Sequence, residues 1–263
     1  MDLIDISKKA TEVIQQVGDY ILKESLDFDV SRVEEKGLND LVSYVDKTAE
    51  RMLVQQLMKV LPNAGFLTEE GTIEEKRKGT LWVIDPLDGT TNFTHGLPIY
   101  AISVALLKED QLALGIVYEL NRNEMFMAIK GNGATCNGLP ISVSPCRVLS
   151  NGLLATGFPF HNFEKMEQYL GILHEFMRTT HGLRRMGSAA VDLAYVACGR
   201  FEGFFEYNLN PWDVAAGALL VEEAGGMVSD FSGENNYLFG REIVASGYTH
   251  HDILQVVDRY WNT

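Results

Sequence analysis

Residues 82–93 read Trp82-Val83-Ile84-Asp85-Pro86-Leu87-Asp88-Gly89-Thr90-Thr91-Asn92-Phe93. An apolar strand ends here in two carboxylates, a glycine and two hydroxyls, a composition that suits a divalent metal and a phosphate better than a hydrophobic core. Pro86 restricts Asp85 to an extended conformation, so the pattern predicts that both acids turn toward one point as the strand stops. Gly89 lets the backbone approach an anion closely, and a helix beginning near Thr90 would direct free N–H groups at it. The segment predicts phosphoester hydrolysis.

The whole chain has the composition of an ordinary globular protein. Its 263 residues, 46% hydrophobic and 22% charged, suffice for one large domain or for two halves that share an interface. No apolar run approaches the roughly 18 residues that span a bilayer. The start, Met1-Asp2-Leu3-Ile4-Asp5, lacks the features of a secretory signal. We therefore expect a cytoplasmic protein that does not associate with membranes.

Cysteine usage and net charge restrict the possible partners. Cys136, Cys146 and Cys198 give neither an even disulfide framework nor a paired zinc motif, so we expect reduced and mostly buried thiols. The 22 Lys and Arg residues against 36 Asp and Glu residues give a formal charge of −14. This charge argues against nucleic acid as a direct partner. It also repels a phosphorylated substrate, so an acidic phosphatase needs bound cations.

The first part of the chain combines helices with hairpins. Apolar residues at helical spacing predict amphipathic helices over residues 3–25 and 45–60. A short strand is expected at 65–68, and the charged run 74–78 is expected to be a solvated loop. Further strands, joined as antiparallel hairpins, are predicted at 81–84, 99–107, 111–119 and 124–129. The glycine-containing segments 131–133 and 137–138 follow these hairpins and open no helix, so they predict turns.

After about residue 145 strands alternate with helices, the signature of an α/β half. Strands are predicted at 153–156, 201–207, 227–229 and 243–246, and helices at 163–179, 188–198, 211–224 and 249–261. Gly225-Gly226 is expected to cap the third of these helices. We expect a single domain over residues 1–263, with halves at about 1–145 and 146–263.

Acidic residues stand at the ends of predicted elements: Asp46, Glu69-Glu70, Asp85 with Asp88, and Asp213. Magnesium prefers hard oxygen ligands, so several carboxylates and one main-chain carbonyl would suit it. Histidine is not needed, and the pair His250-His251 is expected to be exposed to solvent at a helix start.

Each acid also has a purely structural interpretation. Asp213 would be a first-turn helix residue, Glu69-Glu70 a solvated loop, and Thr90 a helix cap. The pair Asp85 and Asp88 is harder to explain in this way, because two acids that close an apolar strand repel each other without a cation.

Two segments together resemble the signature motifs of a known family. These are Asp85-Pro86-Leu87-Asp88-Gly89-Thr90 and Trp212-Asp213-Val214-Ala215-Ala216-Gly217. They resemble the inositol monophosphatase family, part of the magnesium-dependent, lithium-sensitive phosphatase superfamily, and in particular its bacterial inositol-1-monophosphatases. The resemblance extends over nearly the whole chain, through Lys36, Asp40-Leu41-Val42-Ser43 with Asp46, Thr68-Glu69-Glu70, Thr156-Gly157-Phe158-Pro159-Phe160 and Arg185-Met186-Gly187-Ser188-Ala189-Ala190.

The resemblance implies a layered α/β/α/β/α sandwich, a homodimer, and hydrolysis of phosphate monoesters by metal-activated water. It implies that Glu69, Asp85 and the Leu87 carbonyl hold one Mg²⁺. Asp85, Asp88 and Asp213 would hold a second, and a third, weaker one would lie near Glu69 through water. Lithium inhibition is a further implication of the family.

The same resemblance assigns roles around the phosphate and the sugar alcohol. Thr90, paired with Asp46, would orient the attacking water, and Glu69 is also expected to be a catalytic residue. The N–H groups of Gly89 and Thr90 would hold phosphate oxygens. Substrate contacts are expected from Asp88, Ala189, Glu206 and Asp213. The chain departs from the family pattern at Ser43, where threonine is common, and at Glu202, where aspartate is common.

Inositol-1-phosphate is the expected substrate, but two alternatives stay open. A related phosphatase would act on histidinol phosphate, fructose bisphosphate or a nucleotide 3′-phosphate, and only the pocket around 158–160, Ala189 and Glu206 would distinguish it. A catalytically idle binding protein would be expected to lose metal carboxylates, yet Glu69, Asp85, Asp88 and Asp213 are all present.

Overall fold

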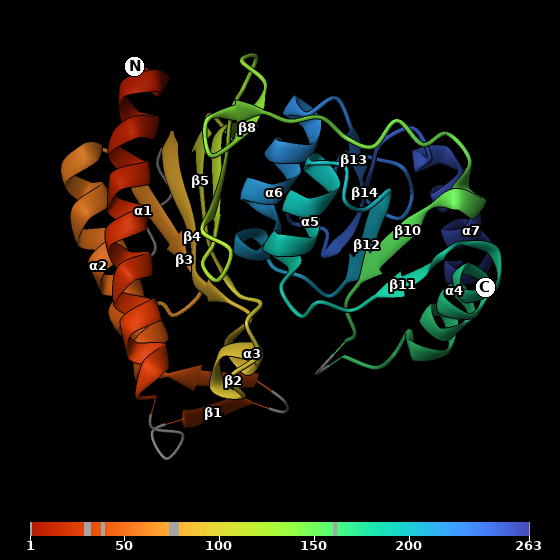
Figure 1. Cartoon of the computed structure of the whole chain (residues 1–263), viewed down its shortest axis with the longest axis horizontal. Coiled ribbons are helices and arrows are strands. Elements are labelled where there is room, and N and C mark those ends of the chain that lie inside the picture. The colour runs from red at the N-terminus through yellow and green to blue at the C-terminus, as the bar shows by residue number, and fades with distance from the viewer. Residues whose placement is uncertain (1, 29–32, 38–39, 74–78, 160–161, 263) are drawn as a thin grey trace.

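The elements of the protein stack in five layers. The computed structural model describes residues 2–28, 33–37, 40–73, 79–159 and 162–262. A helical layer, a seven-stranded sheet, a second helical layer, a five-stranded sheet and a third helical layer follow one another across the molecule (Figure 1). The helical layers are α1 (Leu3–Leu26) with α2 (Tyr44–Val60), α5 (Ala189–Ala197) with α6 (Pro211–Glu223), and α4 (Met166–Thr179) with α7 (His250–Trp261). The predicted α/β/α/β/α sandwich is confirmed.

The larger sheet has the strand order β3-β4-β5-β6-β7-β8-β9. Its strands are β3 (Gly65–Thr68), β4 (Thr80–Asp88), β5 (Ala101–Lys108), β6 (Gln111–Glu119), β7 (Glu124–Ile129), β8 (Ala134–Cys136) and β9 (Leu139–Pro140). Only the β3–β4 pair is parallel, so the predicted antiparallel hairpins are confirmed. Gly131, Gly133, Asn137 and Gly138 have positive φ angles in the turns that were predicted there.

Strand β4 is longer than predicted. The sequence indicated that it stops before the two acids, but the strand continues through Asp85, Pro86 and Leu87 to Asp88. Pairing with β5 is regular up to Asp85, and the register shifts between Asp85 and Asp88. Such a bulge accommodates Pro86, which has no N–H to donate to the ladder. The sheet itself therefore holds both acids.

The smaller sheet has the order β11-β10-β12-β14-β13. Its strands are β10 (Leu153–Thr156), β11 (Gly182–Arg184), β12 (Gly203–Tyr207), β13 (Met227–Ser229) and β14 (Glu242–Ser246). Strand β10 is parallel to β11 and β12, while β14 runs antiparallel to β12 and β13. Four of these strands were predicted to within two residues, and β11 was not. Gly225, with φ +86, ends α6 as expected.

Several short elements escaped prediction. Strands β1 (Val33–Gly37) and β2 (Asp40–Ser43) form an antiparallel pair, and η2 (Leu149–Asn151) is a single 3₁₀ turn. A five-residue helix, α3 (Thr90–Thr94), begins where the sequence suggested one. The charged run 74–78, expected to be a loop, lies outside the described residues.

The central helices α5 and α6 pack closely because glycines face them. A Cβ atom at Gly115 of β6 would lie 2.6 Å from the Ala216 carbonyl oxygen, and one at Gly217 would overlap Leu193 of α5. Helix α6 is apolar nearly all round, as expected for a helix buried between two sheets. It therefore touches the larger sheet through its own backbone, which fixes the position of its first turn.

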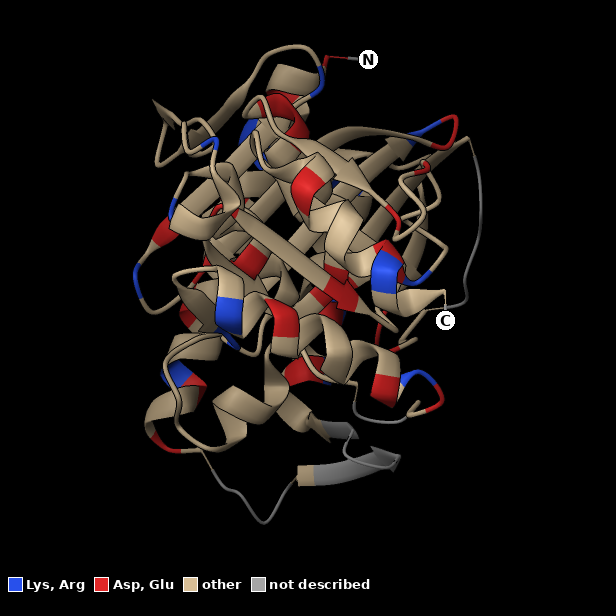
Figure 2. Ribbon diagram, turned by 90° about the vertical axis from the view of Figure 1, so that its right-hand side faces the viewer, with Lys and Arg blue, Asp and Glu red and all other residues tan. Residues whose placement is uncertain are grey.

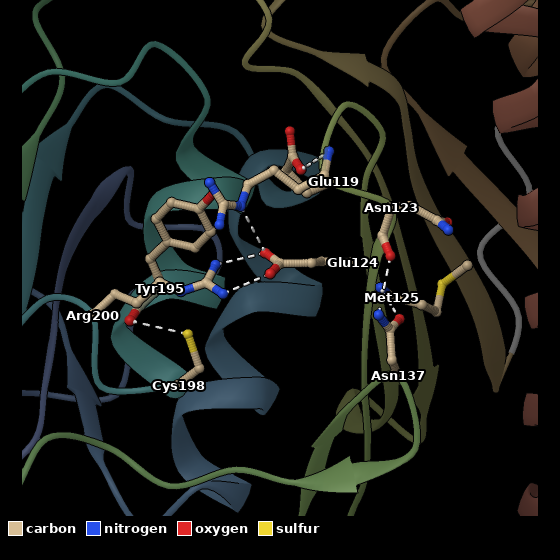
Figure 3. A network of polar contacts seen from close by, with 9 residues as sticks. Glu119, Asn123, Glu124, Met125, Asn137, Tyr195, Cys198 and Arg200 are labelled. Carbon is tan, nitrogen blue, oxygen red and sulfur yellow. Dashed lines mark hydrogen bonds and ion pairs between the residues drawn. The ribbon is translucent and has the colours of Figure 1, made fainter.

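Polar contacts also tie the larger sheet to the central layer (Figure 3). Both terminal nitrogens of Arg200, which follows α5, donate to the two carboxylate oxygens of Glu124 at 2.6 Å. The Arg200 guanidinium lies 4.5 Å from the centre of the Tyr195 ring. Beyond the other end of β7, the N–H groups of Gly131 and Gly133 donate to the Glu223 carboxylate of α6.

Some expectations about single residues were wrong. His250 is buried rather than exposed, with its two ring nitrogens 3.0 Å from the hydroxyls of Ser229 and Ser246, whereas His251 is exposed. The pKa of His250 is lowered to about 4, because burial disfavours the charged ring and His251 adds repulsion. The three cysteines are free, as predicted, but only half-buried.

The charged residues are spread over the molecule. In the view of Figure 2, Lys and Arg positions are scattered among the Asp and Glu positions, and the described residues form no continuous basic stripe across this face. Within the described part of the chain, no helix is both long and apolar enough to cross a membrane.

Candidate active site

Four acids from three elements meet at one end of β4. Glu69 follows β3, Asp85 and Asp88 belong to β4, and Asp213 lies in the first turn of α6. Strands β3 and β4 run in parallel, and the Glu69 N–H donates to the Ile84 carbonyl, so Glu69 lies beside Asp85. The Asp85 carboxyl interacts electrostatically with Glu69, Asp88 and Asp213, and shares a hydrogen bond with Glu69. The structure thus brings all four together.

The protein holds one oxygen of each of the three aspartates in place. The Leu87 N–H donates to Asp85 Oδ1 at 2.9 Å. The Ser188 hydroxyl and the Ala190 N–H donate to Asp88 Oδ2 at 2.8 and 2.6 Å. The Asn210 N–H donates to Asp213 Oδ2 at 2.6 Å, as part of the capping box that starts α6. These contacts fix the carboxyls before any ligand binds.

The cluster strongly disfavours its own ionisation. Burial and then repulsion by Glu69, Asp88 and Asp213 raise the pKa of Asp85 well above its usual value. Burial, Asp88 and Glu69 do the same for Asp213. Burial raises the pKa of Asp88 to about 6, although the Ala190 N–H and the Ser188 hydroxyl oppose the shift. Buried like charges of this kind need a nearby cation to ionise together.

The donor set fits magnesium. Within the described residues, no group of three or more His, Cys, Asp or Glu side chains is already arranged as a metal shell. The chemistry is nevertheless the one Mg²⁺ prefers, namely carboxylate oxygens with the Leu87 carbonyl beside them, and neither imidazole nor thiolate. A bound divalent ion would also remove the repulsion that the four acids impose on one another.

A threonine–aspartate pair lies next to the acids. The Thr90 hydroxyl is 2.7 Å from Asp46 Oδ1 and 3.0 Å from the Leu87 carbonyl oxygen. Asp46, fully buried in the first turn of α2, also accepts from the N–H and hydroxyl of Ser43 through its second oxygen. Burial raises the Asp46 pKa, while the donors Ser43 and Thr90 oppose the shift. Serine at position 43 therefore keeps the hydroxyl that this arrangement uses.

Gly89 links the acids to the threonine and has no room for a side chain. Its φ is +102, and a Cβ atom would lie 3.0 Å from the Ile99 carbonyl oxygen and 3.3 Å from that of Gly187. Both the left-handed backbone and the close approach require glycine here.

Glu206 and Ala189 lie on the side of the site next to Asp88. Ala189 begins α5 directly after Ser188, the residue that binds Asp88. Glu206 lies on β12 and is 7% exposed. Burial raises the Glu206 pKa to about 8; Arg185 opposes the shift and Asp88 adds to it. Its carboxyl packs closely on Gly157, so any side chain at position 157 would have to displace the Glu206 carboxyl.

Residues that carried no predicted role also line this side. Asp192 on α5 is 1% exposed, and its Oδ1 has no hydrogen-bond partner. Burial, followed by repulsion from Glu206 and Asp88, raises its pKa well above the usual value. Arg185 lies near Glu206 and its guanidinium is 5.7 Å from the centre of the Phe158 ring. The sequence could have pointed to Arg185 and Ser188, because both belong to the segment 185–190 that resembles the family. The resemblance did not assign them a role.

The remaining motif residues have other fates. Glu202 connects two other segments of the chain, because it accepts from the Ser144 hydroxyl at 2.8 Å and from the Leu153 N–H at 2.6 Å. The side chains of Lys36 and Asp40, and the whole of Phe160, lie outside the described residues.

A five-layered sandwich that brings four acids, Asp85 fully buried and the other three partly buried, beside a hydroxyl–carboxyl pair has the chemistry of the phosphatase class. Comparison with known proteins agrees with this class. The sequence pattern of the Inositol monophosphatase family matches residues 2–262, and the chain belongs to that family.

Relatives and solved structures extend over most of the chain. Nus factor SuhB of Escherichia coli K12 is 44% identical over 237 residues, 90% of this chain and 89% of that protein. The Thermotoga maritima IMPase structure is 35% identical with a TM-score of 0.88, covering 99% of this chain and 98% of its own. Staphylococcal IMPase-II with inositol monophosphate bound is 27% identical with a TM-score of 0.80, covering 100% and 94%. The same protein is also described with 2′-AMP bound.

Proposed function

We propose that this protein hydrolyses a small phosphate monoester in a Mg²⁺-dependent reaction, with myo-inositol-1-phosphate as substrate. The observation that carries the proposal is the convergence of Glu69, Asp85, Asp88 and Asp213 beside the Thr90–Asp46 pair. Membership in the inositol monophosphatase family supports the same reaction.

Each carboxylate has a place in this proposal. Glu69, Asp85 and the Leu87 carbonyl would hold one Mg²⁺, Asp85, Asp88 and Asp213 a second, and Glu69 a third through water. When bound, Mg²⁺ would supply an activated water and neutralise charge on the phosphoryl group and the leaving oxygen. Lithium inhibition is expected if Li⁺, which carries a smaller charge, occupies a position of Mg²⁺.

Thr90 and Asp46 would orient the attacking water. If the Thr90 hydroxyl donates its single proton to Asp46, its oxygen keeps lone pairs that accept from a water molecule. Asp46 is itself fixed by two donors from Ser43, so the threonine has one preferred orientation. The N–H groups of Gly89 and Thr90 would hold phosphate oxygens. Positioning of this kind is what phosphoryl transfer requires of the protein.

Residues near Asp88 support the choice of substrate class. Glu206, Ala189, Asp88 and Asp213 would contact the hydroxyls of a sugar alcohol, since carboxylates and a small residue leave room for a polyhydroxylated ring. The staphylococcal relative supports this choice through its bound inositol monophosphate, and its bound 2′-AMP makes nucleotide monophosphates the first alternative to test.

The expected partners are a small phosphorylated sugar alcohol or sugar and a second copy of the chain, in the cytoplasm. Absence of direct nucleic-acid binding stays a prediction from the charge of −14. It needs a direct binding measurement, since relatives 44% identical to this chain are named Nus factor SuhB.

A substrate panel tests the proposal. Phosphate release is measured for inositol-1-phosphate, 2′-AMP, 3′-AMP, fructose-1,6-bisphosphate and histidinol phosphate, each with Mg²⁺, without it, and with added Li⁺. We expect Mg²⁺-dependent turnover with inositol-1-phosphate preferred by kcat/KM. Preference for another ester would replace the substrate and keep the reaction. No turnover of any ester at saturating Mg²⁺ would overturn both.

A further inference from the structure

Glu50 is a buried acid that the proposed reaction does not use. It lies on α2, one turn beyond Asp46, and its side chain is completely inaccessible to solvent. A buried carboxylate is costly unless donors surround it. The donors therefore indicate what this residue does.

Among the described residues, the donors to Glu50 come from the end of β3 and from the loop that follows it. Glu50 Oε1 accepts from the Thr68 hydroxyl at 3.0 Å and from the N–H and hydroxyl of Thr72, both at 2.7 Å. Glu50 Oε2 accepts from the Glu70 N–H at 2.7 Å. Four hydrogen bonds to one carboxylate, three of them short, are strong contacts because the acceptor is charged.

These contacts hold the backbone on both sides of Glu69. Thr68 precedes it and Glu70 follows it, while its own N–H is bound to Ile84 of β4. Residues 69–73 form neither helix nor strand, and Gly71 turns the chain with φ +58. Without Glu50, this irregular loop would lose the acceptor that determines its course.

We propose that Glu50 is a positioning residue that fixes the direction of the Glu69 carboxylate and thereby sets the affinity of the site for its metals. This inference rests on the proposed function, because it takes Glu69 as a metal ligand. Outer-shell partners of metal ligands commonly change metal affinity by about 10–100-fold.

Glu50→Gln is the discriminating variant because it keeps volume and shape. Both carboxylate oxygens face donors, so either orientation of the amide would direct its NH₂ group at an N–H or O–H group. The loop must then move. Glu202→Gln is the matched control, since Glu202 also accepts from a hydroxyl and a backbone N–H, but its donors, Ser144 and Leu153, lie far along the chain from the loop that holds Glu69.

The experiment measures binding of Mn²⁺ alone by electron paramagnetic resonance, together with kcat and KM across a Mg²⁺ titration. We expect Glu50→Gln to raise the Mn²⁺ dissociation constant about 10-fold or more, to raise the Mg²⁺ concentration for half-maximal rate in parallel, and to recover most of kcat at saturating Mg²⁺. Glu202→Gln should leave all of these unchanged. Wild-type Mn²⁺ affinity in folded Glu50→Gln would overturn the inference.

Thr72→Val keeps the test decisive if Glu50→Gln does not fold. It removes one donor to Glu50 and should weaken Mn²⁺ binding in the same direction by a smaller factor; unchanged affinity there counts against the inference. Failure of the proposed function can be distinguished from failure of this inference. A parent protein that binds Mn²⁺ but hydrolyses no ester would refute the reaction, and the effect of Glu50 on metal binding could still be measured.

Discussion

At the scale of single residues, the Thr90 hydroxyl occupies the most informative position in the site. It lies between the Asp46 carboxylate and the Leu87 carbonyl, one expected to receive its proton and the other expected to face a metal. A hydroxyl has one proton, so it can donate to only one of these two acceptors when a ligand binds.

Replacing Thr90 by valine should therefore impair catalysis more than binding. The shape is nearly kept, but the hydroxyl that would orient water is lost, so we expect kcat to fall by about 100-fold or more with little change in KM. Steady-state kinetics at saturating Mg²⁺ measure this. Thr91→Val, an exposed neighbour on the same short helix, is the control. A kcat near that of the parent in Thr90→Val would exclude a role in positioning water.

Asp88→Asn removes a charge without removing the acceptor. The asparagine carbonyl can still accept from Ser188 and Ala190, so the fold should be intact by circular dichroism. We expect turnover to fall by more than about 100-fold, because a metal ligand is lost rather than an outer-shell partner. Unchanged turnover would mean that the second metal is wrongly assigned.

Local sequence indicated some of these residues and not others. Asp85 and Asp88 are visible because two acids, a proline and a glycine end an apolar run. Glu50 is not, since its donors are 18 to 22 positions away and a glutamate on an amphipathic helix normally faces solvent. One signal was available: Glu50 precedes the buried Val54 by one turn and Leu57 by two, which places it on the apolar face of α2.

At the scale of elements, the contact between β6 and α6 determines where Asp213 lies. Gly115 lets the backbone of α6 touch the sheet, and Asp213 stands in the first turn of the same helix. A change in this contact should affect stability first and the site second.

Gly115→Ala should lower the free energy of unfolding by about 1–3 kcal/mol, because the added methyl group would be only 2.6 Å from the Ala216 carbonyl oxygen. Denaturant unfolding of both proteins measures the difference. Gly79→Ala is the control, since a Cβ atom there meets nothing within 4 Å. Equal stability of Gly115→Ala and the parent would show that α6 can move away from the sheet freely.

The long elements were predictable, whereas only some of the short ones were. Helices α1, α2, α6 and α7 and strands β6 and β7 follow from periodicity, since each buries one face or is apolar throughout. The short strands β3, β10 and β13 were predicted from their apolar residues, but β1, β2, β8, β9 and β11, with two to five residues each, show no such pattern. The extension of β4 through Pro86 depends on a bulge, which sequence alone does not reveal.

At the scale of the whole molecule, three apolar clusters follow the layers. One joins α1 and α2 to the larger sheet, one fills the centre around α5 and α6, and one joins the smaller sheet to α4 and α7. The resemblance to a family supplied this architecture, whereas periodicity alone gave only the two halves. That residues 1–263 unfold as one unit, and that the protein is a homodimer, stay predictions for calorimetry and light scattering.

Stability should fall in mildly acidic solution because of His250. Its pKa is about 4 when folded, against 6.5 for the ordinary value, so below about pH 6.5 the unfolded chain binds a proton that the folded protein does not. The loss grows as pH falls to about 4 and reaches about 3 kcal/mol, since one pKa unit corresponds to about 1.4 kcal/mol.

Urea unfolding at a series of pH values checks this. His250→Gln should be less stable at neutral pH, yet it should lose about 2 kcal/mol less than the parent between about pH 7.5 and 5. His251→Gln, a change at the exposed neighbour, should keep a pH profile close to that of the parent, because burial is the larger cause of the His250 shift. Parallel pH profiles for the parent and His250→Gln would contradict the assignment.

Asp88 of the larger sheet is held by Ser188 and Ala190 of the central layer, and Asp213 arrives later still in the chain. A ribosome therefore has to deliver most of the polypeptide before the last carboxylate can join the others. Until then the growing chain has an incomplete cluster that should bind cations poorly and cleave nothing. Enzymatic activity would accordingly require that synthesis is complete and that the layers have packed together. Truncated products would therefore be inactive rather than partly active.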